Sequence, residues 1–305
     1  MKTLISFVYS GALLLSTLLI FSCTKNTAKL GSKKNPIKFY LVPAQDLLTL
    51  SEQGKILQQF LIKDLDLEIN VELPVSYISV VEAFGSKRVD VAIMNSLGYI
   101  LAHDKFGVEA KLKLVNRGRD EYYGQIITHV DGPKSIKDLN GKKFAFVDPA
   151  STSGYLLPAY LFKQENIKFK EILFAGKHDA VVTAVYQKKV DAGATFYTPP
   201  DADGTPKDAR WLLRTAYPDV YEKIKILQLT GPIPNDPIVF RKDLPEDIKS
   251  KITNSLLKYI KTPEGAKVLK DMYHITDFKP AADKDYDKIR TYLKDIGLQA
   301  KDFVK

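Results

Sequence analysis

Residues 143–162 read KFAFVDPASTSGYLLPAYLF, and within them a strand pattern gives way to a helix pattern across a short polar loop. The apolar start predicts a buried strand, and the apolar spacing of the second half predicts a helix. Ser151, Thr152 and Ser153 lie at the junction, where the first turn of a helix leaves backbone N–H groups unpaired. Three hydroxyl groups beside these N–H groups make the junction suited to bind an anion. Because Pro158 lies beyond the free N–H positions, we expect a kink or an irregular first turn.

Strands and helices alternate on both sides of this junction. Before it, the order strand, helix, strand, helix, strand is predicted at 37–42, 47–65, 67–73, 79–88 and 89–94. From the junction strand onward the same order is predicted at 143–147, 155–165, 171–176, 179–189 and 190–196. Such an order predicts a mostly parallel sheet with helices on both faces. Its repetition predicts an α/β protein with two similar lobes.

The pattern changes after residue 224. Residues 224–240 predict two strands separated by a proline-rich turn, and helices then continue to the end of the chain. Such a late return would bring the chain from the second lobe back to the first. We therefore expect one lobe from 36–125 with 231–305 and another from 126–230. Strand ends and helix N-termini would converge in a cleft between them.

The N-terminal region has the pattern of a secretory signal. Lys2 is followed by an uncharged apolar stretch from Leu4 to Phe21, and then by Ser22 and Cys23. The end of this stretch resembles the lipobox of bacterial lipoproteins, in which the cysteine is acylated. We expect residues 1–22 to be a signal peptide and 23–35 a lipidated tether to a membrane. An uncleaved anchor helix and an ordinary signal cut nearby are the alternatives.

Composition and charge narrow the functional classes. The chain has 305 residues, 45% hydrophobic and 27% charged, which is typical of a globular protein, and a net charge of +9. Its charges are interspersed, without the basic and aromatic runs that follow a nucleic-acid strand, so we expect no nucleic-acid partner. The single cysteine lies at position 23, so the mature domain has no internal disulfide.

Common enzyme motifs are missing from the sequence. The four histidines have no paired metal-ligand spacing, and neither a Gly-x-Ser-x-Gly elbow nor a Gly-x-Gly-x-x-Gly loop is present. We therefore expect neither enzymatic activity nor a metal or cofactor.

Three segments, taken in order, resemble one family. Residues 122–162, 175–192 and 231–245 are similar to the phosphate/phosphite/phosphonate-binding proteins of ABC transporters, and the resemblance spans roughly residues 36 to 275. It implies a type II periplasmic-binding-protein fold, with a small oxyanion captured between two closing lobes. It also implies a monomer on the periplasmic side of the cell envelope that delivers its ligand to an ABC permease and ATPase complex. A receptor for a signalling partner and a binder of another small anion are the alternatives.

The resemblance assigns most of the candidate ligand-binding residues. It implies that the Ser-Thr-Ser triplet at 151–153 binds the phosphonyl oxygens, although the same residues also suit an ordinary helix N-cap. Family tyrosines that donate hydroxyl groups match Tyr77 and Tyr122, with Tyr123 as the alternative to the latter. The family histidine beside the ligand matches His178.

An acidic residue beside an anion requires a reason. Asp236 matches a family aspartate that faces the ligand, and it could accept a hydrogen bond from a protonated phosphorus oxygen or pair with a ligand amine. In the first case a fully ionised anion such as sulfate is disfavoured. Asn95 and Ser96 follow the equivalent strand of the first lobe, so we expect them to line the cleft as well.

One departure from the family concerns the ligand's substituent. The members that bind aminoalkylphosphonates carry a glutamate where this chain has Thr198. This difference favours phosphate, phosphite or a small alkylphosphonate over an amine-bearing ligand. Arg210 and Arg214 are further candidates for anion contact, but their helical spacing is also typical of a surface.

Overall fold

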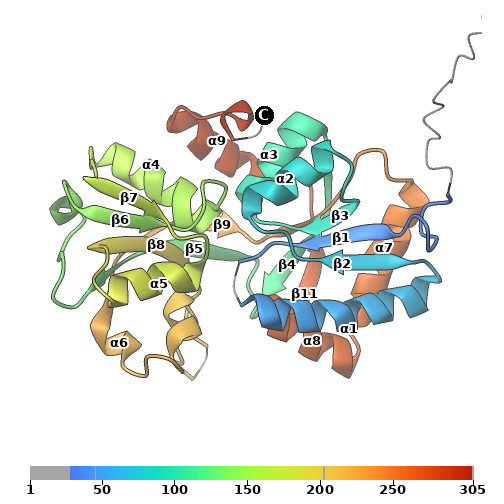
Figure 1. Cartoon of the computed structure of the whole chain (residues 1–305), viewed down its shortest axis with the longest axis horizontal. Coiled ribbons are helices and arrows are strands. Elements are labelled where there is room, and N and C mark those ends of the chain that lie inside the picture. Colours follow the sequence, from blue (N-terminus) through green and yellow to red (C-terminus); the bar gives the residue numbers. More distant parts are fainter. Residues whose placement is uncertain (1–27, 45, 202, 304–305) are drawn as a thin grey trace, which may run out of the picture.

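The structure is a computed structural model that describes residues 28–44, 46–201 and 203–303. The chain forms two lobes, each built on one β-sheet flanked by helices, as Figure 1 shows. The two-lobed α/β fold expected from the sequence is thus confirmed. Both the predicted signal peptide and Cys23 lie outside the described residues. Within the described part of the chain, no helix combines the length and the apolar character needed to span a membrane.

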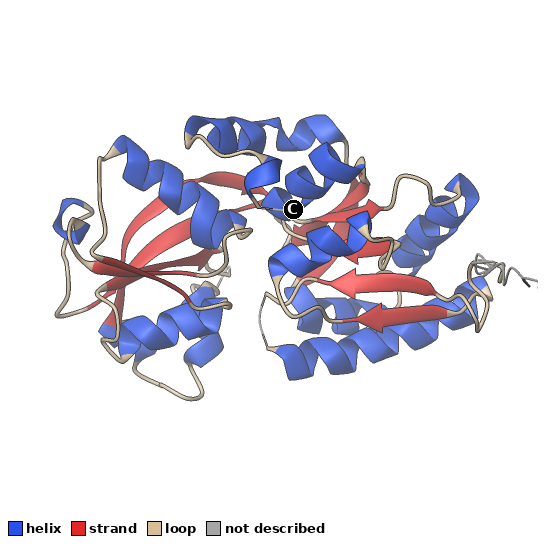
Figure 2. Ribbon diagram, turned by 45° about the horizontal axis from the view of Figure 1, so that its top comes forward, coloured by secondary structure: helices blue, strands red, loops and turns tan. Residues whose placement is uncertain are grey.

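The first lobe has a six-stranded sheet in the order β11-β4-β10-β3-β1-β2. Its strands are β1 (Ile37–Leu41), β2 (Ile69–Glu72), β3 (Val91–Ile93), β4 (Glu109–Asn116), β10 (Pro237–Phe240) and β11 (Ile275–Pro280). The helices of this lobe are α1 (Leu47–Leu65), α2 (Tyr77–Gly85), α3 (Ser96–Phe106), α7 (Glu246–Tyr259) and α8 (Pro263–Tyr273). Helices thus cover both faces of the sheet (Figure 2).

The second lobe has a five-stranded sheet in the order β7-β6-β8-β5-β9. Its strands are β5 (Glu121–His129), β6 (Lys143–Phe146), β7 (Glu171–Phe174), β8 (Ala192–Tyr197) and β9 (Ile224–Pro234). Its helices are α4 (Leu157–Gln164), α5 (His178–Tyr186) and α6 (Val220–Lys223), with a π-helical turn at Thr152–Leu156. Short 3-10 turns occupy Lys137–Leu139, Ala209–Leu213, Asp283–Tyr286 and Ala300–Asp302, and α9 (Asp287–Asp295) lies near the end of the chain.

Helix α1 illustrates how sequence pattern becomes structure. Asp46 caps its start by accepting a hydrogen bond from the Thr49 N–H at 2.8 Å, and Asp66 ends it in the left-handed conformation. One face is buried against the sheet through residues at helical spacing, namely Leu50, Gly54, Leu57 and Leu61. Burial of each leucine stabilises the fold by about 1.5–3 kcal/mol.

The sheets are mixed, and the prediction of mostly parallel sheets was wrong. Strands β1, β2 and β3 pair in parallel, as do β6, β7 and β8, which are the strands of the two predicted βαβαβ units. The strands added beside them, β10, β4 and β11 in one sheet and β5 and β9 in the other, pair antiparallel. Residue periodicity identifies a strand but not its direction, and β4, β5 and β11 were not predicted.

Two short segments join the lobes. The chain crosses between β4 and β5 and returns between β9 and β10, and the expected divisions at 125/126 and 230/231 fall within β5 and β9. Asn235, in the return crossing, donates from Nδ2 to the carbonyl oxygens of Leu114 at 3.0 Å and Arg119 at 2.7 Å. These bonds hold the two crossings side by side, and the pair of crossings is named the hinge.

The end of the chain contacts both lobes. Helix α9 packs against α3 of the first lobe and α4 of the second (Figure 1). Across the second of these contacts, the rings of Tyr160 and Tyr292 have centroids 4.7 Å apart, and Lys163 Nζ donates to the Asp295 carbonyl at 2.8 Å. The C-terminal segment therefore bridges the lobes.

Candidate functional site

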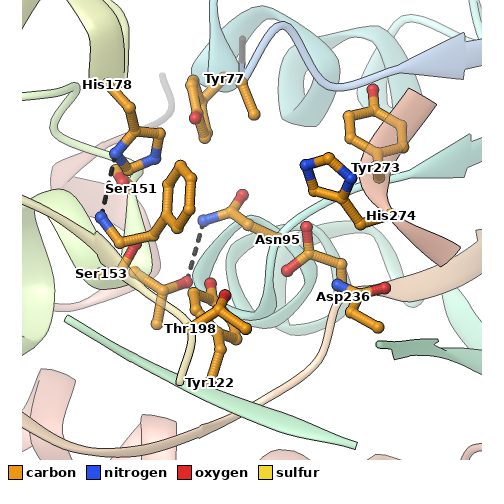
Figure 3. Close-up of a pocket in the computed structure, with 14 residues that line it drawn as sticks. Tyr77, Asn95, Tyr122, Ser151, Ser153, His178, Thr198, Asp236, Tyr273 and His274 are labelled. Carbon is orange, nitrogen blue, oxygen red and sulfur yellow. Dashed lines mark hydrogen bonds between the residues drawn. The ribbon is translucent and has the colours of Figure 1, made fainter. Parts of the chain in front are cut away.

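All eight residues predicted for the site line one cavity between the lobes. They are Tyr77, Asn95, Tyr122, Ser151, Thr152, Ser153, His178 and Asp236. Figure 3 labels all of them except Thr152 and shows how the labelled side chains lie around the space. The cavity has a volume of about 100 Å³. Sites for drug-sized molecules are larger, at roughly 300 Å³ or more, so this cavity fits a small ligand.

The Ser-Thr-Ser turn, residues 151–153, begins the π-helical turn. Ser151 caps it by accepting the Gly154 N–H at Oγ, 3.1 Å away, and its carbonyl accepts the N–H of Leu156 at 3.0 Å. Pro158 has no N–H to offer the carbonyl of Gly154, which instead accepts the Val147 N–H at 3.1 Å. The expected irregular first turn is confirmed, and the first N–H groups of the turn have no partner within the helix.

Glycine at position 154 is required by close packing. A Cβ there would lie 2.4 Å from Val147 Cγ2, on the strand exit that supports the turn. Gly124 has a similar role on β5, because its Cβ would lie 2.8 Å from the carbonyl oxygen of Ser153. These two glycines allow the turn to pack directly against the sheet, which places the hydroxyl groups at the cavity wall.

The turn is bonded to the first lobe as well as to its own. Asn95 donates from Nδ2 to Thr152 Oγ1 at 2.9 Å and to the Ala150 carbonyl at 2.7 Å. The Leu97 N–H also donates to Thr152 Oγ1, at 2.9 Å. Asn95 therefore lies at the cavity as predicted, but its amide group contacts the other lobe.

Two tyrosines bring hydroxyl groups to the cavity. Burial raises the pKa of both Tyr77 and Tyr122 well above its usual value, so each keeps its proton at neutral pH. The Tyr77 hydroxyl is buried without a hydrogen-bond partner among the described residues. Tyr122 lines the cavity, whereas the Tyr123 hydroxyl donates to Glu121 at 3.2 Å. The alternative position for the second tyrosine was therefore not needed.

His178, the first residue of α5, is a neutral hydrogen-bond donor. Burial lowers the pKa of His178 to about 3. Its Nδ1 lies 3.3 Å from the backbone N of Phe196, which donates to it (Figure 3). Since Nδ1 is the acceptor, the ring proton is on Nε2. A neutral histidine in this tautomer can offer one N–H to a ligand without adding charge.

Asp236 follows Asn235 in the return crossing. Burial raises the pKa of Asp236 to about 7, and its Oδ1 has no hydrogen-bond partner in the described part of the chain. The described residues that line the cavity include no lysine or arginine that could offset this carboxylate. Near neutral pH, Asp236 is therefore divided between its protonated and ionised forms, and it can donate or accept a hydrogen bond.

Sequence reasoning missed several lining residues. They are Ala44, Asn116, Tyr273 and His274 of the first lobe and Phe196 of the second. Thr198, which the sequence linked only to the ligand's substituent, lines the cavity as well. Burial, with Arg117 and Lys207 nearby, lowers the pKa of His274 to about 4. The only sequence signal for His274 was its place at the end of a helical pattern. That signal predicts a turn, and it does not indicate that the turn faces a cavity.

Three further residues considered for the cleft, Ser96, Arg210 and Arg214, are not among the described residues that line the cavity. Ser96 Oγ donates to the Pro234 carbonyl at 2.6 Å, beside the hinge. Arg210 is engaged by Asp208 at 2.9 Å, and Arg214 Nη1 donates to the Trp211 carbonyl at 2.8 Å. The expectation that Ser96 lines the cleft was wrong, because a side chain next to a strand end can point to either side.

The cavity combines many neutral donors with one titratable acid. Hydroxyl groups, a helix start and a neutral imidazole can stabilise an oxyanion without a cation. Among the described residues, no group of three or more histidine, cysteine, aspartate or glutamate side chains is placed to hold a metal ion. The arrangement is suited to binding.

Comparison with known proteins agrees with this description. Residues 39–286 match the family model for the periplasmic substrate-binding protein of phosphonate ABC transporters. The phosphonates-binding periplasmic protein of Escherichia coli K12 is 28% identical over 278 residues, which cover 88% of this chain and 77% of that protein. The phosphate-import protein PhnD of Mycolicibacterium smegmatis is 30% identical over 52% of this chain and 54% of its own.

A solved structure shares the fold. The structure of PhnD1 from Prochlorococcus marinus MIT 9301 in complex with methylphosphonate has a TM-score of 0.73 and 22% sequence identity, and the match covers 86% of this chain and 98% of that one. The family match extends over most of the chain and includes both lobes and both hinge crossings. The chain belongs to the family of periplasmic substrate-binding proteins of phosphonate ABC transporters.

Proposed function

We propose that the cavity captures a small phosphorus oxyanion, namely phosphate, phosphite or a small alkylphosphonate, and that closure of the lobes buries it. One observation carries this proposal: neutral donors from 151–153, Tyr77, Tyr122 and His178 line a cavity of only about 100 Å³. The names of two relatives, one that binds phosphonates and one that imports phosphate, support the same ligand class.

Asp236 provides the discrimination among oxyanions. A phosphorus oxyanion that shares one proton with Asp236 gains a hydrogen bond, whereas sulfate has no proton to share at neutral pH. With sulfate, an ionised Asp236 would face a like charge in a cavity without a lysine or arginine among its described lining residues. The ligand is therefore one that exists near neutral pH with a proton on a phosphorus oxygen, which sulfate lacks.

The proposal extends to delivery of the ligand and to the location of the protein in the cell. The closed, loaded lobes would be the form that an ABC permease and ATPase complex recognises. Acylation of Cys23 and a tether at 23–35 would hold a monomeric protein at a membrane on the periplasmic side of the cell envelope. We place the division between the lobes at the two crossings, 117–120 and 235–236, instead of at 125/126 and 230/231.

The proposal is tested by isothermal titration calorimetry of the purified chain with phosphate, phosphite, methylphosphonate and sulfate. Micromolar binding corresponds to about −8 kcal/mol, within reach of a few charge-assisted hydrogen bonds. Simultaneous replacement of Ser151, Thr152 and Ser153 by alanine should abolish the heat of binding while the circular dichroism spectrum stays unchanged. Binding of sulfate alone, or unchanged affinity in the triple variant, would contradict the proposal.

A further inference from the structure

Helix α3 of the first lobe is capped by a side chain of the second lobe. Its N-cap residue is Asn95, whose side chain makes no capping bond to its own helix among the described residues. The N–H of Leu97, the second residue of the helix, instead donates to Thr152 Oγ1 at 2.9 Å. The side chain of the N-cap residue usually accepts such an N–H. Here Thr152 accepts it from across the interface.

Asn95 strengthens the same junction. Its Nδ2 donates to Thr152 Oγ1 at 2.9 Å and to the carbonyl of Ala150 at 2.7 Å, so one amide group bonds both the Ser-Thr-Ser turn and the residue before it. Asn95 is 5% exposed, and Leu97 and Thr152 are 0% and 1% exposed. Buried donors are costly to leave unpaired, so these donors favour the arrangement in which the lobes touch.

A second contact between the lobes has the same form. Asp148 precedes the turn, and burial raises its pKa, while the backbone N–H groups of Ala150 and Tyr77 act in the opposite direction. Tyr77 is the first residue of α2, so a residue of the second lobe again faces the start of a helix of the first lobe. The segment 148–153 thus meets the starts of both α2 and α3.

The Thr152 hydroxyl is divided between the lobes and the cavity. A hydroxyl group has two acceptor lone pairs and one proton, and both lone pairs of Thr152 accept donors of the first lobe. The remaining proton of Thr152 is on the cavity side, where the Thr152 hydroxyl is hydrogen-bonded to Tyr122. This bond and one from Ser153 lower the pKa of Tyr122, against the larger effect of burial, which raises it. A ligand oxygen would accept this proton in place of Tyr122. A ligand oxygen that accepts this proton strengthens the bonds that Thr152 accepts, because linked hydrogen bonds polarise one another.

We propose that Thr152 is a positioning residue that couples ligand capture to lobe closure. Its oxygen holds Asn95 and the start of α3, while its proton faces the ligand. The ligand half of this coupling rests on the proposed function, whereas the cap on α3 does not. Thr152 therefore differs from Ser151, which caps its own turn through the Gly154 N–H.

The test compares three variants of the full chain, purified in detergent. Thr152→Val removes the hydroxyl at constant shape, and Thr152→Ser restores it. Thr183→Val is the matched control, because among the described residues Thr183 Oγ1 bonds only the Asp179 carbonyl of its own helix, at 2.8 Å. Amide hydrogen exchange is measured for the peptide that contains Leu97, without ligand and with methylphosphonate, phosphite or phosphate. The affinity for each probe is measured in parallel.

Thr152→Val should raise the exchange rate at Leu97 and weaken binding, each by about tenfold or more, as expected for loss of two hydrogen bonds. Thr152→Ser should recover most of both properties, and Thr183→Val should leave Leu97 exchange as in the original chain. If exchange at Leu97 is the same in Thr152→Val and Thr183→Val under every condition, the cap and the proposal are wrong. Failure of all three probes to bind would overturn the proposed function, while the exchange data would still decide the cap.

Two further variants distinguish a specific effect on the junction from a general loss of stability. Asn95→Ala removes the other half of the junction, and Asn95→Ala combined with Thr152→Val completes a double-mutant cycle. If the two residues act through one junction, the double variant should weaken binding little more than the stronger single variant. Losses of affinity that multiply would show independent roles and would overturn the proposal.

Discussion

The backbone N–H of Phe196 donates to Nδ1 of His178 at 3.3 Å, which places the imidazole proton on Nε2. A strand residue of the second lobe thereby sets the tautomer of a residue at the start of α5. Since burial lowers the pKa of His178 to about 3, the ring stays neutral across the physiological range. The cavity therefore receives one fixed N–H donor from this side chain.

Two substitutions at His178 should separate the effect of losing its N–H donor from the effect of losing side-chain volume. His178→Ala removes the Nε2–H and should weaken ligand binding about tenfold, the value of one hydrogen bond to a charged group. His178→Gln can place an amide N–H at a similar position and should lose less affinity. Calorimetric titration of both variants with the same oxyanion checks the order, and equal losses would show that the N–H does not contact the ligand.

The same histidine should affect acid stability. The unfolded chain binds a proton at His178 below about pH 6.5, whereas the folded chain does so only below about pH 3, so the free energy of unfolding falls as pH decreases between these values. His178→Gln should reduce this loss. Denaturant unfolding at pH 7 and pH 4.5 measures it, and an identical pH dependence in both proteins would contradict the buried, neutral assignment.

Because of Asp236, ligand affinity should fall as pH rises, whereas the stability that depends on His178 rises with pH. With its pKa raised to about 7, binding that needs one proton shared between Asp236 and the ligand should weaken as pH rises through about 7. The loss should approach tenfold per pH unit above that value. Asp236→Asn supplies a permanent N–H donor and should flatten the profile. Affinity measured from pH 5.5 to 8.5 tests this, and a profile as steep in Asp236→Asn as in the original chain would contradict it.

Ligand-free stability gives an independent check on Asp236. Because the folded chain holds this proton up to about pH 7 and the unfolded chain releases it near pH 4, the contribution of Asp236 to stability declines as pH rises between these values. Asp236→Asn should therefore stabilise the ligand-free chain at pH 8, on the order of 1–3 kcal/mol, relative to its effect at pH 4. Denaturant unfolding at the two pH values measures the difference.

Thr198 should control the choice of substituent. Thr198→Glu adds an acid to the cavity, so binding of methylphosphonate should weaken by tenfold or more through charge repulsion, while aminoethylphosphonate should be affected less or gain affinity. Thr198→Gln is the control of equal size without charge. If Glu and Gln variants bind both ligands alike, Thr198 does not face the substituent.

Gly154 tests the packing under the Ser-Thr-Ser turn. The Cβ of Gly154→Ala would lie 2.4 Å from Val147 Cγ2, so the variant should be destabilised by about 1–3 kcal/mol and should bind more weakly. Val147→Ala removes the opposing methyl groups but keeps the Val147 Cβ, 2.7 Å from the added Cβ, so the double variant should recover only part of the affinity. Thermal unfolding and titration of the two single variants and the double variant measure the coupling.

The turn at 151–153 and Asn95 could be predicted from their places at strand ends, whereas Tyr77, Tyr122, His178 and Asp236 were identified through the family resemblance. The turn at 151–153 and His178 are each at the start of a helix that follows a parallel strand, and this order determines where they meet. Pro158 likewise indicated the irregular turn from local chemistry alone. Parallel βαβ units are the part of a fold that periodicity describes best.

The parts that could not be predicted depend on contacts between distant segments. Asn116 and His274 reach the cavity because β4 and β11 are neighbours in the first sheet, and an antiparallel pairing across about 160 residues leaves no local pattern. The two bonds that Thr152 accepts from the first lobe are of the same kind. The sequence identifies the Thr152 hydroxyl as a possible donor to a ligand, but it does not identify the distant groups that donate to its oxygen.

The most direct test of the central claim is thermal unfolding of the purified, ligand-stripped chain with phosphate, phosphite, methylphosphonate, aminoethylphosphonate and sulfate. A ligand at about one hundred times its dissociation constant adds roughly 2.7 kcal/mol, which raises the melting temperature on the order of 5 to 10 °C. We predict such a shift for at least one of the first three compounds and none for sulfate. A shift with sulfate, or no shift with any phosphorus oxyanion, would contradict the claim that this cavity binds them.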